Sequence, residues 1–374
     1  MASVLESAGE VRMRETTSVS EVRAVGHAAP TVDVVIPCYK YGRYLRRCVE
    51  SVVQQRDVNV RILIVDDASP DDSAEVGAAL ADEYSQVEFR RHGTNAGHIA
   101  TYNEGLIGWS ESPYCMLLSA DDLLAPGALI RAVRIMERDP SVGMVYGRAV
   151  HFYDEQQLPI GETRSAGSIR YKGSEWIKRR CRAGNNVITS PEVVVRSSVQ
   201  RSVGGYRPEL PHSGDLEMWL RIAAVSDIAY VRAPQAFYRV HGASMQRTQF
   251  QGNLVDMVER RAAFHFFIRL SSEKPHARQE LQQDVDRALA KEALWDACRM
   301  YDHGRAEDEQ VQGLVQFALE TWDEAHKLPE FRALKRRQWL GATICHRSQV
   351  FLVPAAIRWA GRRLRKQRWQ RVGV

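Results

Sequence analysis

The sequence predicts an α/β fold, in which a mixed, mainly parallel sheet is flanked by helices and followed by an α-helical region. Apolar runs rich in Val and Ile, such as residues 32–37 and 61–65, alternate with amphipathic stretches as far as residue 240. Runs that are apolar at nearly every position are typical of strands buried on both faces. From about Leu254 to Trp339 the apolar spacing becomes helical throughout. These two patterns together indicate a sheet domain with a helical appendage.

Composition excludes several other classes of protein. The 374 residues are 44% hydrophobic and 26% charged, which excludes a collagen-like, disulfide-framework or wholly disordered chain. No stretch approaches the roughly 18 consecutive apolar residues that span a membrane, and charged residues interrupt the start of the chain before a secretory signal can form. The six cysteines are scattered without a Cys-x-x-Cys pair, which indicates reduced thiols and a cytoplasmic protein.

The first half of the chain is expected to alternate strands with helices. The expected strands are residues 32–37, 61–65, 87–90, 114–118 and 142–153. The expected helices are residues 44–53, 72–84, 99–109 and 127–138. In such sheets, ligands collect where the strands end at their carboxyl edge.

The second half is expected to complete the sheet and then become helical. A polar loop is expected at 154–170, helices at 173–182 and 216–225, and strands at 193–196, 228–232 and 236–240. We therefore divide the chain into a flexible leader (1–30), a sheet domain (31–250), a helical region (251–340) and a basic tail (341–374). Within the sheet domain, the halves are expected at about 31–153 and 154–250.

Two acidic pairs follow expected strands. Asp66 and Asp67 end the second strand, where carboxylates can accept hydrogen bonds from a ligand, although Asp, Ser and Pro there also form a good turn and helix cap. Asp121 and Asp122 follow the strand at 114–118. Adjacent buried carboxylates are costly without a cation, and Mg²⁺ favours one or two carboxylates together with substrate phosphates. The alternative for this second pair is a loop that starts the next helix.

Two further segments have polar residues at expected helix starts. The turn that contains Asn95, Gly97 and His98 can present backbone amides to an anion, although His98 is better explained by packing than by metal binding. Asp215 begins the helix expected at 216–225. It is either an N-cap or a carboxylate that accepts a proton from a hydroxyl group.

The chain resembles the family 2 glycosyltransferases, which have the Rossmann-like GT-A fold, over residues 31–246, about 60% of its length. The matching stretches are VVIPCYKYGRYLRRCVESVVQQ, ILIVDDASPDDS, NAGHIATYNEGL, LLSADDLLAPGAL, GDLEMWLRIA and YRVHGASM. Each stretch is degenerate alone, but six of them in the expected order are specific.

The resemblance implies a role for each candidate residue. It places Pro37, Tyr39, Asp67 and Asp66 at the nucleoside, with Asn95 and Gly97 beside them. It maps the family's Asp-x-Asp pattern, which binds ribose and a divalent metal, onto residues 119–122.

The chain departs from the family pattern at two positions. Ser119 stands where the family has its first Asp, so Asp121 and Asp122 share the metal and ribose roles, with His241 as a further metal candidate. The family's Glu-Asp pair becomes Gly214-Asp215, which keeps the expected catalytic base. The expected cofactor is Mg²⁺ or Mn²⁺.

The activity that the resemblance implies is an inverting transfer of a hexosyl group from a nucleoside-diphosphate sugar, with uridine diphosphate expected. The expected acceptor is a hydroxyl of a bacterial surface glycan or glycolipid. The alternatives are transfer to a soluble natural product, or nucleotide-sugar binding without turnover. The sequence does not specify the sugar, the linkage or the oligomeric state.

The tail is strongly basic. After Glu330 the chain has 12 Lys and Arg and no acidic residue, whereas the preceding 330 residues carry 46 acidic and 39 basic groups. Val350, Val353, Ile357 and Leu364 repeat at helical spacing among arginines, a pattern typical of a helix in an anionic membrane interface. The alternative is a helix that packs on the enzyme. No nucleic-acid recognition motif accompanies the tail.

Overall fold

A computed structural model describes residues 29–153, 165–242, 253–306, 309–347, 351, 360–361, 363–364 and 367–374. Its strands are β1 (Thr31–Cys38), β2 (Asn59–Asp66), β3 (Val87–Arg91), β4 (Tyr114–Leu117), β5 (Leu123–Leu124), β6 (Val142–Phe152), β7 (Ser168–Tyr171), β8 (Val194–Arg196) and β9 (Asp227–Arg239). The helices of the sheet domain are α1 (Gly42–Val53), α2 (Ser73–Glu83), α3 (His98–Asn103), the π-helical turn η1 (Glu104–Trp109), α4 (Ala128–Arg138), α5 (Gly173–Ala183), α6 (Ser197–Val203) and α7 (Gly214–Val225). The later helices are α9 (Asn253–Leu270), α10 (Pro275–Asp302), α11 (Glu309–Thr321), η3 (Ala325–Lys327), α12 (Pro329–Leu340) and α13 (Ala342–Arg347).

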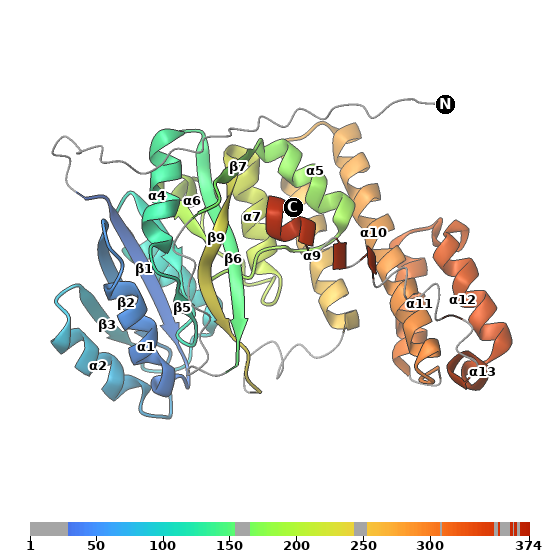
Figure 1. Ribbon diagram of the computed structural model, residues 1–374, viewed down its shortest axis with the longest axis horizontal. Coiled ribbons are helices and arrows are strands. Elements are labelled where there is room, and N and C mark those ends of the chain that lie inside the picture. The colour runs from blue at the N-terminus through green and yellow to red at the C-terminus, as the bar shows by residue number, and fades with distance from the viewer. Residues whose placement is uncertain are drawn as a thin grey trace.

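The sheet has a parallel half and a mixed half. Its strand order is β3-β2-β1-β4-β8-β6-β9-β5, with β7 paired to β9. The first four strands run parallel, β8 runs antiparallel between β4 and β6, and β6 pairs with β9 in parallel. Figure 1 shows α1 and α2 beside the parallel half, and α9 to α13 beyond α5 and α7. The predicted α/β class, with a mixed sheet flanked by helices and C-terminal helices, is confirmed.

Strand β1 is buried on both faces, as its apolar run predicts. Val34 and Ile36 pack in one core cluster with Leu45 of α1, whereas Val35 packs in the other cluster with Leu106. Because successive side chains of a strand point to opposite faces, this single strand contributes to both core layers. The parallel half is thereby fixed between two helical layers, and its carboxyl edge is left open.

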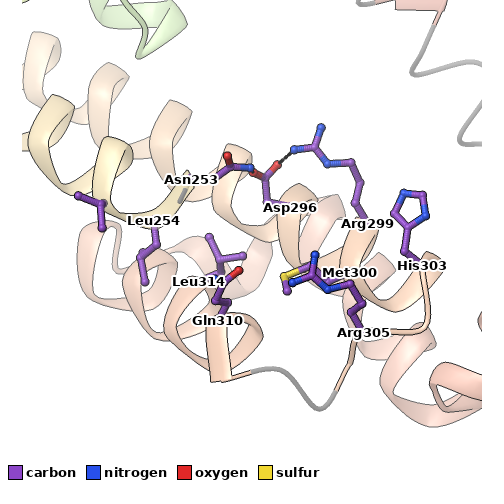
Figure 2. Close-up of a pocket in the computed structure, with 10 residues that line it drawn as sticks. Asn253, Leu254, Asp296, Arg299, Met300, His303, Arg305, Gln310 and Leu314 are labelled. Atoms are coloured by element: carbon purple, nitrogen blue, oxygen red, sulfur yellow. Dashed lines mark hydrogen bonds and ion pairs between the residues drawn. The ribbon is translucent and has the colours of Figure 1, made fainter. Parts of the chain in front are cut away.

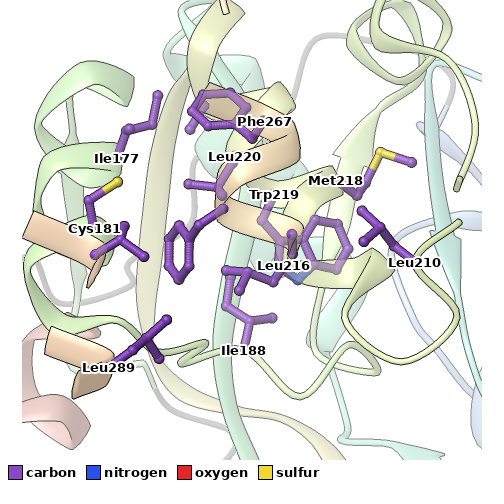
Figure 3. Packing of buried hydrophobic residues seen from close by; sticks show 14 of the residues in the cluster. Ile177, Cys181, Ile188, Leu210, Leu216, Met218, Trp219, Leu220, Phe267 and Leu289 are labelled. Carbon is purple, nitrogen blue, oxygen red and sulfur yellow. The ribbon is translucent and has the colours of Figure 1, made fainter. Parts of the chain in front are cut away.

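The helical region shares a core with the sheet domain. Leu289 of α10 and Phe267 of α9 belong to the same buried cluster as Trp219 of α7 and Cys181 of α5 (Figure 3). The helices after residue 250 therefore share buried side chains with the sheet domain. Helix α10 packs against α5, and α9 packs against α7.

Several elements differ from the expected ones. The two strands expected at 228–232 and 236–240 are one strand, β9, which contains Pro234. Pro234 lies opposite Arg148 at an irregularity of register with β6, a position that tolerates a residue without a backbone N–H. Within the loop expected at 154–170, Ser168–Tyr171 forms β7, and residues 154–164 lie outside the described residues. The short elements β5 and α6 have too few residues to show a period in the sequence.

Residues 367–374 pack on the sheet domain. Tyr146, Tyr171 and Tyr230 donate hydrogen bonds to the backbone carbonyls of Gly373, Val372 and Gln370, at 2.6, 2.6 and 2.8 Å. Gly373 has φ +76°, and a Cβ there would lie 2.3 Å from the Tyr230 ring. For these residues the packed alternative holds. Much of the apolar repeat of the tail falls at 352–359, outside the described residues.

No helix in the described ranges combines the length and the apolarity that crossing a bilayer requires.

Candidate active site

A cleft of about 740 Å³ opens at the carboxyl ends of β1, β2 and β4. Asp67, Asp121 and Asp122 reach it from the strand ends, and Asp215 reaches it from the first turn of α7. Its volume lies within the range of about 300–1,000 Å³ typical of sites for small molecules. Four carboxylates from distant parts of the chain thus line one cavity.

One side of the cleft has the groups expected to contact a nucleoside. Pro37, Tyr39, Asn95 and Gly97 all line it, and Tyr39 is 41% exposed. Gly97 has φ +85°, a backbone conformation that favours glycine, and it directs the chain into α3. An exposed aromatic ring beside amide and carbonyl groups suits a planar base.

Asp66 lies outside this cleft, contrary to the role that the resemblance implies. It is fully buried, it accepts a hydrogen bond from the Ser69 amide, and it lies 3.4 Å from Arg91 Nε. The reason is the alternation of side chains along a strand, which turns Asp66 and Asp67 to opposite faces. Asp66 stabilises the turn after β2 and does not line the cleft.

Asp67 faces the cleft and organises the turn beside it. Its carboxylate accepts hydrogen bonds from the amides of Ala96 and Gly97 at 2.7 and 3.0 Å, and it lies 2.7 Å from His92 Nδ1. The other ring nitrogen of His92 lies 2.7 Å from Glu104. Burial opposes the charged imidazole, but the hydrogen bonds with Asp67 and Glu104 raise the pKa of His92 above its usual value. Asp67 therefore shapes the pocket as well as lining it.

Asp122 is a buried carboxyl with one unused oxygen. It is 1% exposed, its Oδ1 accepts a hydrogen bond from the Arg239 amide at 2.8 Å, and its Oδ2 has no partner among the described residues. Burial, together with the neighbouring charge of Asp121, raises the pKa of Asp122 well above its usual value. Such a carboxyl is stabilised in its charged form only when a cation or further donors approach it.

These two carboxylates fit a hard divalent cation. Two adjacent carboxylates, one with an unused oxygen, are the ligands that Mg²⁺ takes alongside phosphates and water. The Nε2 atom of His241 lies 2.9 Å from Asp121 Oδ2, so the imidazole lies beside one of these carboxylates. Within the described ranges, no three His, Cys, Asp or Glu side chains gather in a way that could hold a metal by themselves. A cation here would need ligands from the donor, and the metal role expected of His241 stays a prediction.

Asp215 is partly exposed to the cleft and is held by three donors. Asn186 Nδ2 and Ser190 Oγ donate to its Oδ2 at 3.0 and 3.2 Å, and the Leu216 amide donates to its Oδ1 at 2.7 Å. Burial raises the pKa of Asp215, and these hydrogen bonds oppose part of that rise. The helix N-cap is Ser213, so Asp215 is not the cap that the alternative expected. A partly buried carboxylate with raised basicity, open to a cleft, can accept a proton.

Three aromatic residues that the sequence did not single out complete the cleft wall. Tyr102, Tyr206 and Tyr238 line it, and the first two rings meet edge to face at 5.5 Å. Burial raises the pKa of each hydroxyl, so all three remain protonated donors near neutral pH. Asn103 Oδ1 accepts a hydrogen bond from the Tyr206 amide at 2.6 Å, and Asn103 Nδ2 donates one to the Tyr206 carbonyl at 2.8 Å. These two bonds tie α3 to the segment that contains Tyr206. Because these residues lie about 100 positions apart in the sequence, no local pattern joins them.

A second pocket of about 470 Å³ lies among α9, α10 and α11 (Figure 2). Its acidic residue Asp296 already accepts a hydrogen bond from Asn253 at 2.5 Å and pairs with Arg299. The pocket contains neither adjacent carboxylates nor any of the residues expected to bind a nucleotide. This pocket therefore lacks the groups that the cleft brings together.

Comparisons with known proteins agree with this geometry. Residues 33–197 match the model of the glycosyl transferase family 2. The protein MT1568 of Mycobacterium tuberculosis is 29% identical over 67% of this chain and 79% of its own length. The glycosyltransferase YibD of Escherichia coli is 24% identical over 59% of this chain and 65% of its own length. The glycosyltransferase GlyG of Streptococcus pneumoniae is 29% identical over 39% of this chain and 54% of its own length.

Among solved structures, TarS of S. aureus (residues 1–349, in complex with UDP-GlcNAc) superimposes with a TM-score of 0.56. The superposition covers 83% of this chain and 91% of that one, at 12% sequence identity. At this identity the likeness shows a shared fold.

Proposed function

We propose that this chain is a family 2 glycosyltransferase that transfers a hexosyl group from a UDP-sugar to an acceptor hydroxyl with inversion at the anomeric carbon. The observation that carries the proposal is the cleft that Asp215 lines together with the strand-end carboxylates Asp121 and Asp122. A direct displacement at a sugar requires a base for the acceptor and, at the leaving diphosphate, a cation such as a carboxylate pair can hold.

The donor's nucleoside is assigned to the side lined by Pro37, Tyr39, Asp67 and Asn95. Two observations support a uridine nucleotide. The pocket pairs an exposed tyrosine ring with amide and carbonyl groups, and a protein of the same fold was solved with UDP-GlcNAc. Its diphosphate then lies towards Asp121 and Asp122.

Asp121 and Asp122 would hold Mg²⁺ or Mn²⁺ together with the diphosphate. When bound, such a cation supplies a Lewis acid that offsets the charge developing on the leaving phosphate oxygen. The unused Oδ2 of Asp122 and the raised pKa of its carboxyl support this assignment.

Asp215 is assigned as the general base. Its carboxylate takes the proton of the acceptor hydroxyl, and the hydroxyl oxygen forms a bond to the anomeric carbon. The bond from that carbon to the diphosphate oxygen breaks, and its electron pair leaves with the nucleoside diphosphate. Attack from the face opposite the leaving group inverts the configuration. The rings of Tyr102, Tyr206 and Tyr238 offer apolar faces and hydroxyl donors to the sugar and keep bulk water from competing.

The acceptor is assigned to the class of bacterial surface glycans or glycolipids, reached from the cytoplasmic side. The basic charge of α12 and α13 and the exposure of Trp339, at 85%, support contact with an anionic membrane surface. The packing of residues 367–374 on the sheet domain limits that contact to the segments before them.

The proposal is tested by measuring nucleoside diphosphate release from a panel of nucleotide sugars with Mn²⁺ present. We expect release from UDP-sugars above GDP- and TDP-sugars, and faster release when lipid-linked or polysaccharide acceptors are added. Tight donor binding without release, whatever acceptor is supplied, would instead indicate a binding protein. Faster release only with soluble small molecules would assign the acceptor to natural products.

A further inference from the structure

The segment between α5 and β8, residues 184–193, brings two polar side chains to Asp215. Asn186 Nδ2 and Ser190 Oγ both donate to the same carboxylate atom, Oδ2, at 3.0 and 3.2 Å. The donors lie 29 and 25 residues before Asp215 and on a different element of the fold. Such convergence from a separate segment differs from local capping, in which the partner is part of the same turn.

Buried side chains and hydrogen bonds to the backbone hold this segment in place. Ile188 is 4% exposed and packs in the core cluster with Leu216, the residue after Asp215 (Figure 3). Glu192 is 1% exposed, and its Oε1 accepts a hydrogen bond from the Thr189 amide at 2.7 Å. Asn186 Oδ1 accepts a hydrogen bond from the Ile188 amide at 3.1 Å. The two donors are therefore presented by a backbone that is tied to the core on both sides of Ser190.

Ser190 adopts a backbone conformation that serine rarely takes. Its φ is +89°, outside the regions that ordinary L-residues favour. A residue held in such a region is strained and persists only when its surroundings determine it. In Ser190 this conformation accompanies a hydroxyl that is directed at Asp215.

We infer that Asn186 and Ser190 are positioning residues that fix Oδ2 of Asp215 and leave Oδ1 as the atom that receives the acceptor's proton. A carboxylate has about four acceptor positions, two on each oxygen. Two donors occupy Oδ2, and the Leu216 amide occupies one position on Oδ1, which leaves one position on Oδ1. The inference rests on the proposed base role of Asp215.

Asn186 and Ser190 do not titrate, but several titratable groups lie near Asp215. His212 lies in the segment before α7, Glu192 lies before β8, and the tyrosines Tyr102, Tyr206 and Tyr238 come from three other parts of the cleft wall. Burial raises the pKa of Glu192 to about 7, so Glu192 titrates in the same range as activity measurements. Substitutions of Asn186 and Ser190 leave all of these groups in place. Asn186→Ala also removes the hydrogen bond that the Ile188 amide donates to Asn186, whereas Ser190→Ala removes a donor to Asp215 without that second change.

The test compares Asn186→Ala, Ser190→Ala and the double variant with the wild type, by ¹³C NMR titration of carboxyl carbons in the ligand-free protein. The Asp215 signal is assigned by its loss in Asp215→Asn. Because hydrogen bonds to a carboxylate favour its charged form, their removal raises the pKa, by about one unit in the double variant. The matched control is Asn185→Ala, since Asn185 is exposed and accepts a hydrogen bond from Arg180 rather than contacting Asp215.

A second readout is UDP release from UDP-GlcNAc as the donor probe. We expect kcat to fall roughly tenfold to a hundredfold in the double variant, the KM for the donor to stay within about twofold, and the acid limb of the pH profile to move upward. If the double variant is unstable, the single variants supply the test, and we expect each of them to lower kcat by a smaller factor.

The outcomes separate the two proposals. An Asp215 carboxyl that titrates in the double variant as it does in the wild type overturns the positioning role. Wild-type UDP release by Asp215→Asn overturns the base assignment, whatever the NMR titration shows.

Discussion

Replacing Asp215 with Asn is expected to lower the rate of sugar transfer by about 10²–10⁴-fold, the usual contribution of a general base. Asparagine keeps the shape of the side chain and cannot take a proton from the acceptor. Because the proposal assigns the donor to residues at the ends of β1, β2 and β4, its Kd is expected to stay within about twofold of the wild-type value. Rapid-quench transfer assays and calorimetric titration of the donor measure the two quantities.

The matched control for this substitution is Asp284→Asn. Asp284 lies on α10, outside the cleft, and pairs with Arg182 at 3.3 Å. Its variant is expected to transfer sugar at the wild-type rate. Turnover that is equally reduced in both variants would point to general destabilisation rather than to loss of a base.

Chelation of divalent cations by EDTA is expected to abolish transfer, and Mn²⁺ or Mg²⁺ is expected to restore it. The reason is electrostatic, because Asp121 and Asp122 place two carboxylates beside the expected diphosphate, and without a cation these charges repel. Asp121→Asn, which removes one of the charges, is expected to raise the Mn²⁺ concentration that gives half-maximal activity by about tenfold or more. Titrations of activity against Mn²⁺ measure this value.

The melting temperature in EDTA provides the control. Since the described residues do not enclose a metal by themselves, chelation is expected to leave the melting temperature of the donor-free protein unchanged. Full transfer in EDTA would show that the carboxylate pair does not act through a cation.

The sequence predicted the sheet domain because its signals are local. Val32, Val34, Val35 and Ile36 place apolar side chains on both faces of a strand, and the acidic residues that follow β2 and β4 fall where parallel strands end. Patterns of this kind depend on neighbouring residues alone. The sequence also predicted Asp67, Asp121, Asp122 and Asp215 as candidates, and the structure brings them to one cleft.

Other features of the site depend on contacts between distant segments. Asn186 and Ser190 reach Asp215 only because Ile188 is buried against α7, and no spacing in the sequence reveals that packing. Asp66 and Asp67 are adjacent in the sequence, yet only the pleat of the chain at the end of β2 decides which of the two lines the cleft. The orientation of His241 towards Asp121 likewise depends on where β9 ends.

The most direct measurement is a crystal structure of Asp215→Asn with Mn²⁺ and an intact UDP-sugar. We expect the uracil beside Tyr39 and Asp67, the diphosphate beside Asp121 and Asp122, and the face of the anomeric carbon opposite the phosphate turned towards residue 215. A donor bound outside this cleft, or one whose sugar points away from residue 215, would contradict the assignment of the cleft as the site of transfer.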